Sequence, residues 1–104
     1  MGRRLDNPLW EQAVRLGLND YAGLCEEDAF RFGWWMVETA RAFDNGHYQY
    51  RVGMLDEERW RMHYLDVVLF FQRPGVREWW RTSTPNLSPE FVSLVEEILV
   101  EQDQ

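Results

Sequence analysis

The chain contains two histidines, and each lies three residues from an aspartate: Asp44 precedes His47, and His63 precedes Asp66. Residues three apart share one face of a helix, and imidazole and carboxylate groups are common ligands of a metal ion held between helices. Helical phase argues against such a site, because His47 falls on an apolar face and the other pair on a polar strip. We therefore predict no metal, a core histidine at position 47 that is hydrogen-bonded to a neighbour, and a surface pair formed by His63 and Asp66.

Aromatic side chains could instead bind a small molecule, since the chain has six tryptophans, six phenylalanines and four tyrosines. His47, Tyr50 and Tyr64 could line a pocket, although aromatic residues at helical spacing more often form a core. The sequence contains no Ser-His-Asp, Cys-His or glycine-rich phosphate-binding pattern, and it lacks lysine, which excludes Schiff-base and P-loop chemistry. We predict a non-enzymatic protein without a cofactor; a ligand pocket or enzyme site near these three residues is the alternative.

Two pairs of adjacent tryptophans, at positions 34–35 and 79–80, indicate an interaction surface. Neighbouring residues of a helix point about 100° apart, so a short helix can hardly bury both on one narrow stripe. We expect one member of each pair to lie in the core and the other at an edge, where tryptophan is common in interfaces. The interface candidates are Trp34, Trp79 and Trp80.

The stretch from Leu55 to Arg73 is the element around which we expect the other helices to pack. Asp56 is a good N-cap, two glutamates follow it in the first turn, and Pro74 marks the end. Apolar residues nearly encircle the stretch, and its narrow polar strip consists of Arg59, His63, Asp66 and Arg73. A helix that is hydrophobic on most sides is normally central to its domain.

Caps and apolar stripes indicate four further helices, at about 8–17, 26–52, 74–82 and 89–101. Gly53 suits the left-handed residue that ends a helix, and Ser88 followed by Pro89 is a strong helix start. The predicted fold is all-α, a small helical bundle. It is built on a long antiparallel hairpin, 26–52 with 56–73, flanked by a short N-terminal helix and two C-terminal helices.

Length and composition indicate a single domain, 1–104, with frayed ends at 1–6 and 102–104. The chain has 104 residues, of which 45% are hydrophobic, enough for one ordered core. It contains one cysteine, Cys25, which excludes an internal disulfide and a cysteine-based zinc site. No apolar run approaches the length of a membrane span and no signal-peptide pattern opens the chain, so we predict a cytoplasmic protein.

The formal net charge of −7 argues against a nucleic-acid partner, because phosphate binding needs a basic surface. An acidic helix face could bind a basic protein, although such a face is usually only solvated. Its residues are Glu90, Glu96, Glu97 and Glu101.

Three blocks of the sequence together form a recognisable pattern. In chain order they are FDNGHYQYRVGMLDEERW, RPGVREWWR and LSPEFVSLVEEIL. Over about residues 5–100 they resemble a family of uncharacterised bacterial proteins that carry YYQYRxGLLDEExW, PGxRxWW and SPEF motifs. His47 and Gly46 depart from that pattern. The resemblance implies an all-helical domain, an N-terminal membrane helix in several members, and no assigned activity.

These observations together predict a protein-interaction or structural module that is able to self-associate. The expected partner is a protein or a second copy of the chain, with no nucleic acid. Membrane association is expected only through an N-terminal anchor that this chain lacks.

Overall fold

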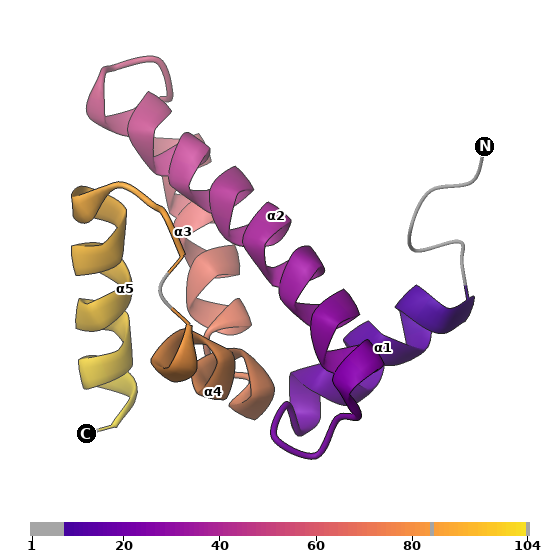
Figure 1. The fold of residues 1–104 in the computed structure, drawn as a ribbon. Helices are drawn as coiled ribbons and strands as arrows, with labels where there is room; N and C mark the ends of the chain where they lie inside the picture. The colour runs from indigo at the N-terminus through magenta and orange to yellow at the C-terminus, as the bar shows by residue number, and fades with distance from the viewer. Residues whose placement is uncertain (1–7, 84, 104) are drawn as a thin grey trace. The chain divides into compact units, whose positions relative to one another are not determined.

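The structure, a computed structural model, describes residues 8–83 and 85–103 and contains five α-helices in that part of the chain (Figure 1). The described residues include no strand, which confirms the all-α prediction. The predicted fraying of residues 1–6 lies outside the described residues. The helices are α1 (Pro8–Asn19), α2 (Glu26–Arg51), α3 (Glu57–Phe70), α4 (Pro74–Thr82) and α5 (Pro89–Gln102).

The capping residues behave as their sequence signals predict. The side chain of Asp56 accepts a hydrogen bond of 2.8 Å from the backbone N–H of Arg59, and that of Ser88 accepts one of 3.3 Å from Phe91. Each bond satisfies a backbone donor that a helix start leaves without a partner. Gly53 follows α2 with a φ of 81°, the left-handed conformation that glycine adopts without steric cost.

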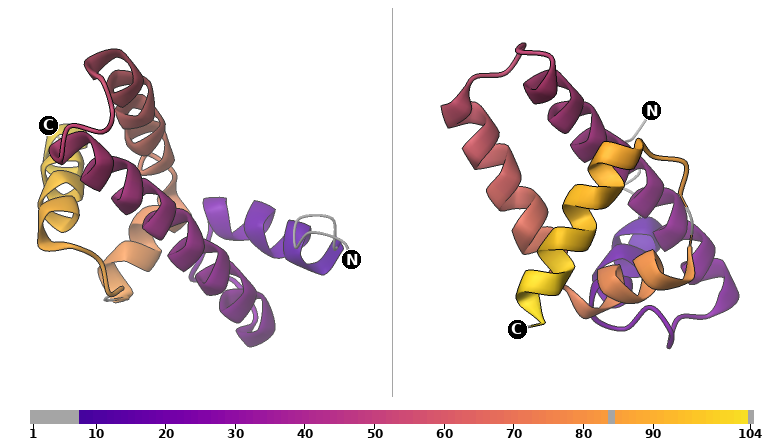
Figure 2. Two further views of the ribbon diagram at one scale, coloured as in Figure 1. Left: turned by 90° about the horizontal axis from the view of Figure 1, so that it is seen from above. Right: turned by 90° about the vertical axis from the view of Figure 1, so that its left-hand side faces the viewer.

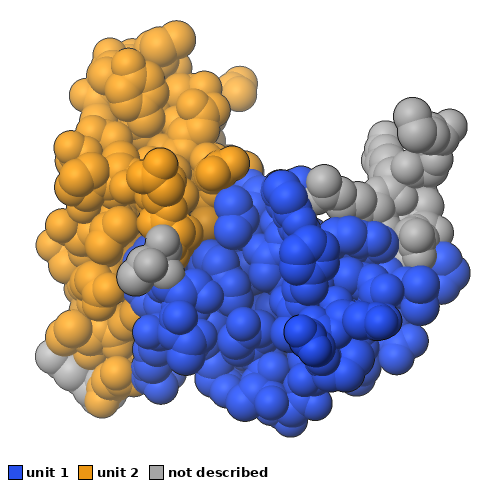
Figure 3. All heavy atoms as spheres, viewed as in Figure 1, with its two compact units in different colours: residues 1–38, 73–84 blue, residues 39–72, 85–104 orange. Residues whose placement is uncertain are grey.

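The chain divides into two compact units, coloured separately in Figure 3: unit 1 is Met1–Glu38 with Arg73–Thr84, and unit 2 is Thr39–Gln72 with Pro85–Gln104. The sequence predicted one domain. Helix α2 contributes its first half to unit 1 and its second half to unit 2, and it stays helical through Asn45-Gly46.

In unit 1, α1 packs against α4 at a point where two glycines meet. A β-carbon at Gly75 would overlap the carbonyl oxygen of Gly17, and one at Gly17 would overlap the ring of Phe32. The two backbones can approach this closely only because neither position has a side chain. The side chain of Arg73 adds a hydrogen bond of 3.0 Å to the Asn19 carboxamide.

The paired tryptophans of α4 are both buried, Trp79 with 4% and Trp80 with 8% of its surface exposed. The expectation that one of them lies at an edge is therefore wrong. Gly75 and Val76, one turn earlier, are also buried. The four residues form two adjacent rows along the helix, so the buried stripe is about 100° wide and accommodates both indole rings.

Unit 2 consists of the second half of α2 together with α3 and α5, and Figure 2 shows α5 running alongside the other two. Gln102, expected in the frayed tail, is the last residue of α5, and its Nε2 donates a hydrogen bond of 3.0 Å to the carbonyl oxygen of Val68. The deepest core residues of the unit are Ala40, Val67, Phe71, Phe91, Val95 and Ile98.

Helix α3 is not the buried rod that the sequence predicted, because Val67 is the one residue within its bounds that is buried. Met62, Leu65 and Leu69 are 66%, 56% and 51% exposed. The helices of unit 2 cover a single face of α3 and leave these side chains on the opposite face. The predicted hairpin 26–52 with 56–73 remains a prediction, since only the second half of α2 shares a unit with α3.

Candidate functional site

The three residues predicted to line a pocket meet around one side chain, the indole of Trp60. Its ring centroid lies 5.2 Å from that of His47, 4.7 Å from that of Tyr50 and 5.9 Å from that of Tyr64. These four residues form an aromatic cluster in unit 2. Sequence reasoning placed the three together but missed that Trp60 fills the centre of the cluster.

Tyr50 joins the end of α2 to the start of α3. Its ring stacks on Trp60 with an angle of 8° between the planes, and its hydroxyl donates a hydrogen bond of 2.6 Å to Oε1 of Glu57. This bond to a carboxylate raises the pKa of Tyr50 above its usual value, because deprotonation would remove the donor.

His47 lies between Trp60 and Phe91, whose ring centroid is 6.2 Å away. Its Nδ1 is buried and has no hydrogen-bond partner among the described residues. Burial lowers the pKa of His47, and the positive charge of Arg51 lowers it further. Both effects favour the neutral imidazole within the aromatic cluster, whereas the negative charges of Asp44 and Glu90 act in the opposite direction.

His63 does not form the predicted surface pair with Asp66. Its Nε2 lies 3.2 Å from the carbonyl oxygen of Phe43 on α2, and its ring meets the Phe43 ring at 74°. Gly46 makes this approach possible, because a β-carbon there would overlap the imidazole. The inward face of α3 runs through Trp60 and His63, so the polar strip predicted for this helix is wrong at position 63.

The two His–Asp pairs do not converge on a metal site. Asp44 instead accepts hydrogen bonds from the backbone N–H and the hydroxyl of Ser88, at 2.9 Å and 2.6 Å, and so fixes the start of α5 against α2. In the described part of the chain, no group of three or more His, Cys, Asp or Glu side chains is arranged to hold a metal ion.

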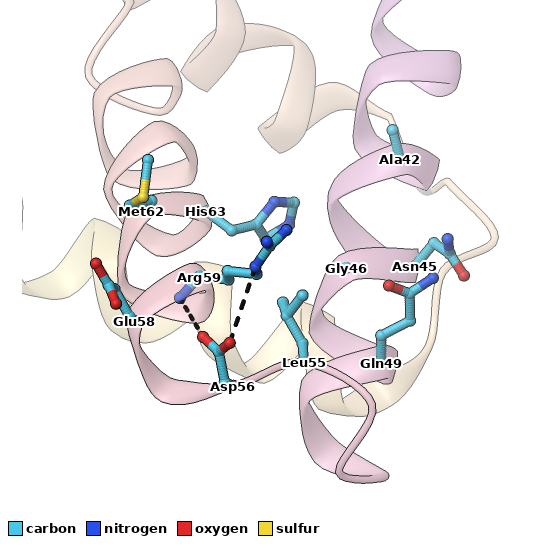
Figure 4. Close-up of a pocket in the computed structure, with 10 residues that line it drawn as sticks. All are labelled: Ala42, Asn45, Gly46, Gln49, Leu55, Asp56, Glu58, Arg59, Met62 and His63. Carbon is cyan, nitrogen blue, oxygen red and sulfur yellow. Dashed lines mark hydrogen bonds and ion pairs between the residues drawn. The ribbon is translucent and has the colours of Figure 1, made fainter.

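An open groove of about 760 Å³ lies between α2 and α3, beside the aromatic cluster (Figure 4). Figure 4 shows Arg59 and His63 extending from α3 toward α2, which contributes Asn45 and Gln49, while Glu58 lies on the far side of α3. The groove is lined by Ala42, Asn45, Gly46, Gln49, Leu55, Asp56, Glu58, Arg59, Met62 and His63. Its one sequence signal is Gly46 inside a helix, which indicates close approach by a neighbour.

The groove offers charged and hydrogen-bonding groups from both helices. Asp56, which caps α3, lies 3.8 Å from the guanidinium of Arg59, so the two charges partly satisfy each other at the mouth. The carboxamides of Asn45 and Gln49 offer both donors and acceptors. The lining residues include no serine, threonine, cysteine or lysine.

A continuous apolar surface lies next to the groove, on the outer face of α3. Met62, Leu65 and Leu69 follow one another at intervals of three and four residues, the spacing of one helix face. We call these three residues the α3 stripe. Met54, in the turn before the helix, is 73% exposed and adds apolar surface to unit 2.

The charges that accompany the α3 stripe cancel, although the whole chain carries −7. Between positions 58 and 69 there are two acidic residues, Glu58 and Asp66, and two basic residues, Arg59 and Arg61. This segment is therefore neutral overall. A surface of this kind can meet another neutral or self-complementary surface without net repulsion.

Trp34 is the one tryptophan interface candidate that lies at the surface. It is 45% exposed on α2, in unit 1, and Phe30 one turn earlier is 66% exposed. The two residues form a second, smaller apolar patch, the Phe30–Trp34 patch.

None of the described helices is both long enough and apolar enough to cross a membrane. Comparisons with protein-family models, curated proteins and solved structures gave no match to this chain. The resemblance carried by the three sequence blocks therefore remains a prediction.

Proposed function

We propose that this protein is a non-enzymatic helical interaction module that self-associates through exposed apolar surface, with the hairpin 26–52 and 56–73 as its scaffold. The observation that carries the proposal is the α3 stripe. Its three large apolar side chains lie in a row, more than half exposed, on the best-capped helix of the chain. Water contact with such a row is unfavourable, and contiguous apolar surface on a soluble domain commonly marks a protein contact.

The composition of the stripe supports a reversible contact. Fully burying a Leu or Met side chain contributes about 1.5–3 kcal/mol, and the stripe residues are already partly covered, so each gives a fraction of that. Association itself costs several kcal/mol. We therefore expect a dissociation constant on the order of micromolar or weaker. Met62, with an unbranched side chain, can adapt to the surface that it meets.

Size-exclusion chromatography with light scattering over a range of concentrations tests self-association. The monomer has a mass of 12.6 kDa, and we expect the measured mass to rise toward twice that value with concentration. A mass that stays at the monomer value up to millimolar protein would overturn the proposal.

A second candidate function is small-molecule binding near His47, Tyr50 and Tyr64. The groove favours it, because the ring centroid of His63 in its wall lies 5.6 Å from that of Trp60 at the centre of the aromatic cluster, although the three candidate residues themselves do not line the groove. A fragment screen followed by NMR tests it: a ligand in the groove would shift the indole N–H signal of Trp60 and the backbone signals of Gly46. Signals that stay unmoved across the screen would exclude this candidate.

We also propose a cytoplasmic location, with membrane association only through an anchor outside this chain. Fractionation of cells that express the full natural gene tests this, since a tethered protein would sediment with membranes and an untethered one would stay in the supernatant.

A further inference from the structure

We propose that α3 of one copy packs antiparallel against α3 of a second copy, about a two-fold axis level with Met62 and His63. The inference rests on the proposed self-association and names its surface, its partner and its geometry. It follows from the position of the α3 stripe and from the charges along one edge of that stripe.

The α3 stripe lies on the side of the helix opposite its packed face. Trp60 and Val67 define the packed face, and at 100° per residue Met62 and Leu69 project from the other side. The stripe keeps helical spacing over two turns, so a second straight helix can follow it along its whole length. The partner that fits is therefore a helix with an apolar stripe of the same length.

The charges beside the stripe favour a second copy in the antiparallel orientation. Arg59 and Asp66 are seven residues apart, so they lie two turns apart on the same edge of the stripe and carry opposite charges. Antiparallel pairing about an axis midway between them places Arg59 of each copy level with Asp66 of the other. Parallel pairing in register would place the Arg59–Asp66 edges of the two copies on opposite sides of the interface, so Arg59 of one copy would not meet Asp66 of the other.

The same axis also sets which apolar residues meet. Met62 lies almost on the axis and faces Met62 of the second copy. Leu69 of each copy lies level with Asp56 of the other, close to Leu55, which lines the end of the groove. The paired α3 stripes thus cover the outer face of α3 in both copies. The Leu69 end of each stripe reaches the groove of the other copy.

Charge distribution over the rest of the chain disfavours other homotypic contacts. The chain carries −7, whereas positions 58–69 are neutral, so the excess of negative charge lies elsewhere. The first turn of α2, for example, holds three consecutive acids, Glu26, Glu27 and Asp28. Two copies that approach through positions 58–69 therefore meet over a segment that adds no net charge to the repulsion between them. One helix pair is a small interface, so the dimer is weak and reversible.

Disulfide trapping distinguishes the antiparallel pair from the alternatives. The single cysteine, Cys25, is exposed and is first replaced by serine. In this background we expect Met62→Cys to form a covalent dimer rapidly under mild oxidation. Leu69→Cys should not, because the antiparallel register separates the two Leu69 positions by about 20 Å along the helix axis. Equal trapping at both positions would indicate a parallel pair and would overturn the proposed geometry.

Charge exchange tests the register without changing the apolar stripe. Arg59→Asp and Asp66→Arg should each weaken the dimer about tenfold, since either change converts two attractive pairs into two repulsive ones. The double variant Arg59→Asp/Asp66→Arg should restore the affinity of the original chain. Arg81→Asp, an equal charge change on the exposed side of α4, is the matched control and should leave the affinity within about twofold.

Apolar substitutions separate this inference from the proposed function. Leu65→Glu should weaken the dimer at least tenfold, while Val100→Glu, at an exposed valine of α5, should not; both should keep their helical circular dichroism. A dimer that survives Leu65→Glu, or that is lost in Trp34→Glu instead, overturns the α3 pairing but leaves self-association standing. A strict monomer in the original chain overturns both proposals.

Discussion

The imidazole of His63 occupies the space that a side chain at position 46 would need. Its Nε2 lies 3.2 Å from the carbonyl oxygen of Phe43, so the ring is held against α2 from two sides. This contact brings α3 close to α2 and places one wall of the groove. A glycine in mid-helix is unfavourable by about 1 kcal/mol relative to alanine. Gly46 offsets this cost by leaving space for the imidazole of His63.

Gly46→Ala tests that relationship, because its effect depends on the residue at position 63. In the original chain we expect a loss of about 1–2 kcal/mol in the free energy of unfolding, since overlap with the ring outweighs the gain in helix propensity. In a His63→Ala background the same change should stabilise the protein by about 0.5–1 kcal/mol. Urea unfolding followed by circular dichroism measures both values. An equal effect in the two backgrounds would contradict the steric explanation.

Gly75→Ala should separate α1 from α4. The new β-carbon would overlap the carbonyl oxygen of Gly17, a backbone atom that cannot rotate away, and we expect a loss of about 2–3 kcal/mol. Gly33→Ala is the matched control, because its β-carbon would lie 3.6 Å from Nε1 of Trp79, an ordinary contact. The free energy of unfolding of Gly33→Ala, measured by thermal unfolding, should rise by up to about 1 kcal/mol. Similar melting temperatures for the two variants would show that the glycine contact is unimportant.

The bonds between Asp44 and Ser88 should be energetically coupled. Ser88→Ala removes the side-chain cap of α5 and the hydroxyl donor to Asp44, while the backbone N–H of residue 88 can still donate to that carboxylate, so we expect a loss of about 2 kcal/mol. A double-mutant cycle with Asp44→Ala should give a coupling energy of about 1 kcal/mol. Ser93→Ala, at an exposed position inside α5, should change stability by less than about 0.5 kcal/mol. Additive effects of the two substitutions would show that the bond from the Ser88 hydroxyl to Asp44 contributes nothing.

His47 should make unfolding depend on pH in mildly acidic solution. Because burial lowers its pKa in the folded state, the unfolded chain binds the proton more readily, and stability falls as the pH drops below the ordinary histidine pKa of about 6.5. The loss continues until the pH reaches the lowered pKa of the folded state. His47→Gln should remove this part of the slope below about pH 6.5 in chemical unfolding measured at several pH values. If the slope of the unfolding free energy against pH is unchanged in His47→Gln, groups other than His47 cause the pH dependence.

Local signals in the sequence were sufficient to predict where several helices begin. Asp56 and Ser88 each accept a hydrogen bond from a backbone N–H three residues later, so the information lies within one turn of helix. Gly53 adopts the left-handed conformation for an equally local reason. His47, Tyr50 and Tyr64, which the sequence offered as pocket candidates, do lie around one side chain, Trp60, but they do not line the groove.

The features that depend on contacts between distant segments could not be predicted in this way. The apolar residues of α3 surround the helix, so periodicity alone did not decide which face is covered and left Met62 and Leu65 on the wrong side. The inward position of His63 depends on Gly46, which lies on another helix. The groove likewise exists only because two helices pack at this distance, and its lining residues have no shared sequence pattern.

The glycine contact between α1 and α4 has a consequence for the order in which the protein folds during synthesis. Unit 1 is assembled from two segments of the chain, and the whole 39–72 segment of unit 2 is translated between them. A nascent chain that stops before Arg73 therefore contains α1 and the Phe32 ring next to Gly17, but not α4. Helix α1 can pack against α4 only after α4 has been synthesised, so the contact between α1 and α4 forms late in folding.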